Sequence, residues 1–152
     1  MRIFAAAAMA GLLLAGAGVA GAQSVSSSGA TIKERQEHMK AMGGAMRTLG
    51  NYVKKEGGVS LDDAKKAATT LNERASGPVW TLFPAGSIGD SAARPEIWSQ
   101  EAQFKKAAAD FQQASSQLVQ AVNAGQDAQI AQAFGATGKT CGTCHEAFRV
   151  KK

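Results

Sequence analysis

The chain has 152 residues, of which 45% are hydrophobic and 19% are charged, and its formal net charge is +5. This length suffices for one domain with a buried core and is too short for two domains of ordinary size. The basic residues are spread along the chain, without interleaved aromatic residues except in a C-terminal cluster, so nucleic acid is not an expected partner.

The first 22 residues have the pattern of a cleaved secretory signal. A basic Arg2 precedes an apolar run from Ile3 to Val19, and the small residues Ala20-Gly21-Ala22 follow. An uncleaved membrane anchor is the alternative, but the apolar run is short for a span and is diluted by glycine and alanine. We therefore expect residues 1–22 to be removed on export and residues 23–152 to form one domain.

Apolar periodicity predicts a first helix from Thr31 to about Lys55. Its apolar positions recur every seven residues, with others offset by three, as in a helix packed into a bundle: Ile32, Met39, Met42, Met46, Leu49 and Val53. Arg35 falls on the same stripe. A guanidinium in that position is costly unless it meets an anion or reaches the surface.

A second, weaker helix is expected from about Leu61 to Arg74. Ser60 is a suitable N-cap, and Asp62 and Asp63 place negative charge in the first turn. Residues 76–95 then hold all three prolines and several glycines, which indicates a long connection. We expect its Trp80 and Phe83 to fold back over an apolar surface.

A third helix is expected to begin just after Pro95 and to end at Gly125, with heptad-spaced Ile97, Phe104, Phe111 and Leu118. A fourth helix shows apolar steps of four and three through Ile130, Phe134, Thr137, Cys141, Cys144 and Phe148. Four helices without a strand pattern predict an all-α fold, an antiparallel up-and-down four-helix bundle with one long crossover loop.

The segment CGTCH places Cys141, Cys144 and His145 on one face of the fourth helix. This arrangement is typical of covalent haem c, with thioether bonds to both cysteines and the imidazole below the iron. Three alternatives are a thioredoxin-type redox pair, a zinc site that borrows His38, and a structural disulfide. The redox pair needs a βαβ context, the zinc site lacks ligands, and the disulfide would constrain little chain.

A bound haem also accounts for the arginine in the first helix, because a haem propionate is the anion that such a guanidinium needs. The alternative for Arg35 is a side chain that reaches the surface. Gly43 and Gly44 in the same helix indicate a close approach by another helix or by the haem.

The chain resembles cytochrome c′, a four-helix monohaem family of the bacterial periplasm, in the segments RQEHM, WTLFPAGS, RPEIW and CGTCHEAFR. The resemblance implies one haem c on Cys141 and Cys144, with His145 as the iron ligand and Arg149 beside its imidazole. It implies a propionate contact for Arg35 and a distal position for Met39, and we expect Trp80 and Phe83 to line the cofactor. Phe148 stands where the family usually has tyrosine.

The role of Met39 has three interpretations. The side chain shields an open sixth position of the iron, ligates the iron in a low-spin electron carrier, or belongs to the core remote from the haem. His38 is a weaker candidate for a distal ligand, since it sits at the edge of the apolar stripe.

The leading functional hypothesis is a periplasmic protein that is not an enzyme and that binds nitric oxide or carbon monoxide at a five-coordinate haem. The second is a His/Met electron carrier, with a redox partner steered by Lys139, Arg149, Lys151 and Lys152, although these charges also suit solubility. The third is a helical interaction protein without haem. The resemblance further implies a homodimer through the first two helices, whose outer face we expect to carry Tyr52 and Lys54.

Overall fold

The computed structural model describes residues 20–77 and 79–151, so the expected leader, residues 1–22, lies outside the described residues except for its last three. Four long helices dominate the fold: α1 (Ala20–Lys54), α2 (Leu61–Ser76), α4 (Glu101–Ala124) and α5 (Asp127–Phe148). The 3-10 helix η1 (Val79–Leu82) and the single turn α3 (Glu96–Ser99) lie in the connection between α2 and α4. Within the described ranges, no helix is long and apolar enough to cross a membrane.

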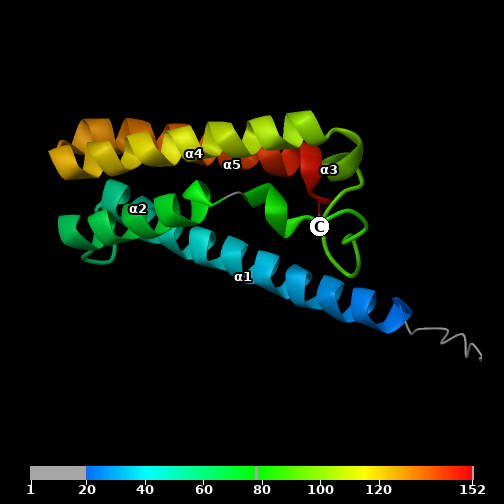
Figure 1. The fold of residues 1–152 in the computed structure, drawn as a ribbon. Coiled ribbons are helices and arrows are strands. Elements are labelled where there is room, and N and C mark those ends of the chain that lie inside the picture. The colour runs from blue at the N-terminus through cyan, green and yellow to red at the C-terminus, as the bar shows by residue number, and fades with distance from the viewer. Residues whose placement is uncertain (1–19, 78, 152) are drawn as a thin grey trace, which may run out of the picture.

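The predicted antiparallel four-helix bundle is confirmed. Figure 1 shows α4 and α5 side by side along their length, with α2 and α1 on the other side of the bundle. α2 packs along both α1 and α4, whereas α1 and α5 meet over a shorter stretch. The described residues form no named strand, and their β pairing is one isolated antiparallel bridge between Ala93 and Arg149.

The predicted boundaries differ from the observed ones in two places. α1 begins at Ala20, eleven residues before the predicted Thr31, because residues 20–30 lack the apolar periodicity on which the prediction depended. The single third helix was wrong, since Gln100 (φ −124°, ψ 45°) separates α3 from α4. Ile97 and Phe104 keep their heptad spacing and remain buried across this break, so periodicity alone does not reveal it.

The ends of the helices are fixed by polar contacts. Ser60 caps α2 as predicted: the N–H of Asp63 donates to its hydroxyl, and its own N–H donates to the Asp63 carboxylate, both at 3.1 Å. The expected outward position of Tyr52 was wrong. Its ring is buried, and its hydroxyl donates to Asp127 Oδ1 at 2.7 Å, which ties the end of α1 to the start of α5.

The hydrophobic core is divided into two clusters. The larger one, here called the bundle core, joins all four long helices and contains fully buried Leu49, Leu71, Leu118 and Ile130. The smaller one, here called the aromatic cluster, has Ile97, Phe104 and Phe148 at its centre. A small domain usually has one contiguous core. The aromatic cluster joins α4 and α5 to the long connection, as a smaller cluster beneath a long connection commonly does.

The two clusters meet near the place where α1 and α5 diverge, and the angle between these two helices is here called the wedge (Figure 1). A Cβ at Gly50 would lie 3.3 Å from the Phe134 ring, and one at Gly138 would lie 3.8 Å from Met46, so the two helices touch at this level. Figure 1 shows that α1 diverges from α5 toward the end of the molecule where the chain's C-terminus lies. The two helix backbones are farthest apart near the end of α5, which contains CGTCH (Figure 1).

We predict that Leu118→Ala lowers the free energy of unfolding by about 2–5 kcal/mol, because the side chain is fully buried in the bundle core. Chemical denaturation of the purified protein measures this loss. Val150→Ala is the matched control, since Val150 is half exposed and its truncation should change stability by less than about 0.5 kcal/mol. Equal stability of the two variants would contradict the assignment of the core.

Candidate haem site

The CGTCH segment lies in the last two turns of α5, where the two core clusters meet. Both cysteine side chains are half-buried: Cys141 packs against the bundle core and Cys144 against the aromatic cluster. The two thiols are free and form no disulfide. They therefore face the division in the core together, which suits attachment of a flat, apolar group between the clusters.

The surroundings of these residues favour their neutral forms. Burial raises the pKa of the Cys141 thiol, and it raises the pKa of Cys144 to about 11. A redox pair of the thioredoxin type needs a lowered pKa, so the structure gives that alternative no support. Although His145 is exposed at one edge, partial burial, and secondarily the charge of Arg149, lower its pKa. A neutral imidazole carries the lone pair that binds iron.

The zinc alternative also lacks support. Within the described part of the chain, no three His, Cys, Asp or Glu side chains gather in a group that could hold a metal ion. His38, the other histidine of the chain, donates through Nε2 to the carbonyl of Arg74 at 2.7 Å. Its ring is thus engaged with α2 and fits the interpretation of a partly packed residue.

Arg35 is buried, with 4% of its surface exposed, so the alternative of a side chain reaching the surface was wrong. Its Nη1 donates to Leu82 O and Ser87 Oγ, both at 3.3 Å, and its Nη2 donates to Ser87 O at 2.8 Å and to Ser91 Oγ at 3.5 Å. The guanidinium carbon also lies 4.4 Å from the centre of the Phe83 ring. Every contact comes from the connection between α2 and α3.

Arg35 has no anionic partner among the described residues, whose ion pairs all involve other side chains. Burial lowers its pKa, which reflects the cost of removing the charge from water. Neutral oxygens compensate part of this cost, and a carboxylate would compensate more. The site is therefore chemically suited to a ligand that brings its own carboxylate.

Met39 stands on α1 one turn after Arg35. Gly50 of α1 touches Phe134 of α5, and this contact sets the register of the two antiparallel helices. Met39 lies eleven residues before Gly50 and His145 lies eleven residues after Phe134, so Met39 and His145 are at the same level of the two helices. Met39 is half-buried and belongs to neither core cluster, in contrast to Met42 and Met46, which pack on the bundle core. The interpretation of Met39 as remote core is therefore not supported.

The expected approach of another helix to the glycine pair was wrong. No described atom lies within 4 Å of a Cβ placed at Gly43 or Gly44, because both face open space. Their contact with the haem stays a prediction.

Trp80 and Phe83 fold back as predicted, onto the aromatic cluster that also contacts Cys144. Phe104 makes edge-to-face contacts with Phe83 and Phe148, at centroid distances of 4.9 and 5.2 Å. Phe148 is buried here, so its ring fills space without a hydroxyl.

Arg149 follows the last residue of α5 and is exposed. Around it, Val150 N–H donates to Ala92 O at 2.8 Å and Arg94 N–H donates to Phe148 O at 3.0 Å. The end of α5 is thus fastened to the connection that surrounds Arg35.

Two residues of this region, Ser87 and Trp98, were not predicted from the sequence as part of the site. Ser87 is 1% exposed and accepts from Arg35, and Trp98 Nε1 lies 3.0 Å from Phe83 O and 3.1 Å from Pro84 O. Both residues lie in segments that resemble the family, WTLFPAGS and RPEIW, but neither segment indicates what its last side chain contacts, and PAGS predicts only a tight turn.

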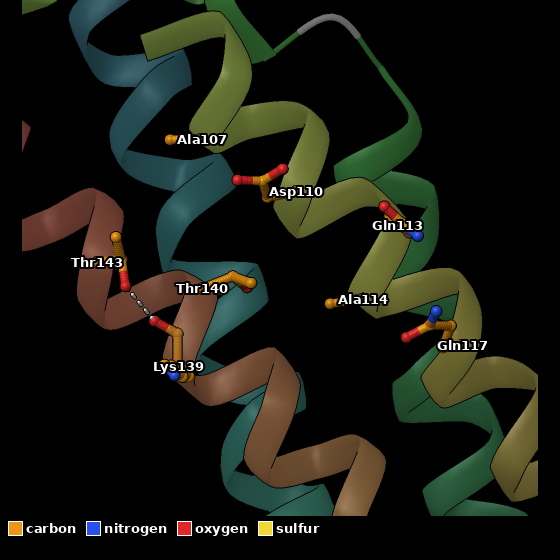
Figure 2. Close-up of a pocket in the computed structure, with 8 residues that line it drawn as sticks. All are labelled: Ala107, Asp110, Gln113, Ala114, Gln117, Lys139, Thr140 and Thr143. Atoms are coloured by element: carbon orange, nitrogen blue, oxygen red, sulfur yellow. Dashed lines mark hydrogen bonds between the residues drawn. The ribbon is translucent and has the colours of Figure 1, made fainter. Parts of the chain in front are cut away.

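Two surface hollows lie outside the wedge. Figure 2 shows one of about 390 Å³ between α4 and α5, lined by Ala107, Asp110, Gln113, Ala114, Gln117, Lys139, Thr140 and Thr143. On α5, Thr143 and His145 point in nearly opposite directions, because they are two residues apart at 3.6 residues per turn. The second hollow, of about 360 Å³, borders the aromatic cluster at Trp80, Phe83 and Trp98.

Known proteins are similar to this chain in sequence and in fold. A family model described as cytochrome C′ matches residues 30–149. Cytochrome c-556 of Agrobacterium tumefaciens (strain B2A) is 37% identical over 121 residues, covering 80% of this chain and 98% of the relative. Cytochrome c′ of Alcaligenes xylosoxydans xylosoxydans is 35% identical over 122 residues, covering 80% of this chain and 94% of the relative.

Among solved structures, a nitric oxide complex of a cytochrome c prime variant from Alcaligenes xylosoxidans aligns with a TM-score of 0.76 at 31% identity, covering 82% of this chain and 97% of that one. A carbon monoxide complex of another variant aligns with a TM-score of 0.75 at 31% identity, with the same coverage. The family carries covalently bound haem c, and the two neighbouring thiols of α5 fit that cofactor. The chain therefore belongs to the cytochrome c′ family.

Proposed function

We propose that this protein is a periplasmic monohaem cytochrome that binds small gases, nitric oxide and carbon monoxide, at a five-coordinate haem and that is not an enzyme. The observation that carries the proposal is the composition of the α1 face opposite His145. That face presents the thioether of Met39, while the imidazole of His38 is bound to the carbonyl of Arg74. His38 is therefore engaged away from a sixth coordination position, and Met39 is the side chain that we propose as the shield of that position.

Each residue of the site has a role in holding the cofactor. Cys141 and Cys144 would form the thioether bonds, and His145 would supply the iron ligand. When bound, haem iron supplies a coordination position for a diatomic gas and can accept or donate one electron. Arg149 keeps a positive charge beside His145, which favours the neutral imidazole.

The opposite wall orients the cofactor and excludes water. Arg35 would meet a haem carboxylate, which would supply the anion that its buried charge lacks. Trp80 and Phe83 would cover the apolar edge from the aromatic cluster. Met39 would restrict the distal side to small ligands, and because its side chain donates no hydrogen bond, bound dioxygen would gain no stabilisation there.

A second candidate function is electron transfer with Met39 as sixth ligand. It is favoured by the position of Met39, level with His145 and held by neither core cluster. Lys139, Arg149 and Lys151 are exposed on and after α5 and would attract an acidic redox partner, whereas Lys152 lies outside the described residues. A thioether ligand would favour reduced iron.

The proposal includes export and self-association. Residues 1–22 have a secretory pattern, which supports a periplasmic location for a domain of residues 23–152. A cytochrome c′ whose dimer dissociates under ligand control aligns with a TM-score of 0.76 at 26% identity, which supports a homodimer here. Tyr52 contributes no outer surface to it because the ring is buried.

Gas binding separates the two candidate functions. We predict a high-spin ferrous absorption spectrum that changes on addition of carbon monoxide, because His145 would be the only protein ligand. Visible spectroscopy of the matured protein, reduced and then exposed to the gas, measures this. A low-spin spectrum that the gas leaves unchanged would contradict the gas-binding proposal.

Substitution of Met39 gives the second prediction. Met39→Ala should leave the spin state unchanged and speed carbon monoxide association by roughly 5- to 150-fold, since relief of steric strain of roughly 1–3 kcal/mol lowers the barrier by that amount. Stopped-flow mixing measures the rate. Met42→Ala is the control, because Met42 packs on the bundle core. Conversion from low-spin to high-spin by Met39→Leu would instead establish the electron carrier.

Covalent attachment gives the third prediction. In a host with cytochrome c maturation, the wild-type mass should exceed the mature chain by one haem, and the Cys141→Ser/Cys144→Ser variant should lack it. Intact-mass spectrometry under denaturing conditions measures both. Thr143→Ser is the control within the same turn of α5, since its exposed hydroxyl donates to Lys139 O. A colourless wild-type protein would favour the third hypothesis, a helical interaction protein without haem.

A further inference from the structure

Ser87 is a buried polar residue for which the proposed function assigns no role. It ends a tight turn in which its N–H donates to Pro84 O at 3.1 Å. Gly86 has φ +77° at the third position of this turn, a conformation that glycine adopts without strain. The sequence PAGS thereby directs Ser87 inward, where only 1% of its surface is exposed.

Ser87 holds both terminal nitrogens of the Arg35 guanidinium. Its hydroxyl accepts from Nη1 at 3.3 Å, and its carbonyl accepts from Nη2 at 2.8 Å. Phe83, four residues earlier, lies under the guanidinium plane at 4.4 Å. A planar group held at two nitrogens and lying over a ring has few orientations open to it.

The turn itself is anchored from the opposite side. Trp98 of α3 directs its indole N–H to Phe83 O at 3.0 Å and Pro84 O at 3.1 Å. Arg35 on α1 and Trp98 on α3 therefore donate hydrogen bonds to the same turn from two different helices. A shift of either side chain would break its hydrogen bonds to the backbone of the turn that carries Ser87.

We propose that Ser87 is a positioning residue that fixes the Arg35 guanidinium and so determines how strongly its charge acts on the bound haem. This inference rests on the proposed function, in which Arg35 meets a haem carboxylate. A fixed positive charge in a poorly solvated site favours the iron state with one positive charge fewer, which is the reduced state. Loosening the guanidinium would let water screen it and would lower the reduction potential.

The test measures the midpoint reduction potential of the matured holoprotein by spectroscopic titration. Ser87→Ala should lower the potential, in the same direction as Arg35→Gln and by a smaller shift. In the Arg35→Gln background, Ser87→Ala should cause no further shift, because the two residues act through one interaction. Ser87→Thr keeps the hydroxyl and should restore most of the potential.

Ser99→Ala is the control, since Ser99 is an exposed serine of α3 whose hydroxyl lies 3.5 Å from Pro95 O. The reduction potential of this variant should equal that of the wild type. Hydrogen exchange of the holoprotein gives a second readout: peptides covering residues 82–91 should exchange faster in Ser87→Ala. An unchanged potential in Ser87→Ala, or a shift of equal size in the Arg35→Gln background, would overturn the inference while leaving haem binding intact. Absence of haem from the wild type would overturn the proposed function as well.

Discussion

Arg35 carries a positive charge into the interior at the point where α1 meets the connection between α2 and α3, and the described residues offer it no carboxylate. The carbonyls of Leu82 and Ser87, the Ser87 hydroxyl and the Phe83 ring receive the guanidinium. These contacts shape the long connection, since the turn closed by Gly86 and the anchoring indole of Trp98 are arranged around them. A structure that buries a charge in this way is prepared for an anionic ligand. A loop of this length without regular structure is uncommon in a compact domain unless it serves a site.

The remainder of the site follows from how α1 and α5 diverge. Small residues at Gly50 and Gly138 let the helices touch at one level, and beyond it the core separates into the bundle core and the aromatic cluster. Cys141 contacts one cluster and Cys144 the other, so a group bound to both would lie where the two clusters meet. Such a group would complete a core that the side chains leave divided. Binding of such a group to the folded chain would stabilise the fold.

Much of this arrangement was predictable from the sequence, and the failures have physical causes. Heptad spacing identified the helices and the buried positions Leu49, Leu118 and Ile130, because burial of one helical face imposes that period. The break at Gln100 keeps the period, so it was invisible, and Tyr52 appeared to be a surface residue because its partner Asp127 lies 75 positions away. The segment CGTCH predicts Cys141 and Cys144 as attachment residues from its motif and its helical spacing, without any long-range contact. Ser87 depends on a contact with Arg35 across 52 positions, which no local pattern records.

In the proposed holoprotein, His145 is the one protein ligand to iron and Met39, on α1 at the same level, shields the opposite side. Resonance Raman spectroscopy of the ferrous holoprotein tests this most directly, because the iron–imidazole stretching band is strong only when the iron is five-coordinate and high-spin. We expect this band in the wild type, and we expect it to persist in Met39→Leu. Its absence from the wild type together with its appearance in Met39→Leu would rule out a five-coordinate haem and would assign Met39 as the sixth ligand.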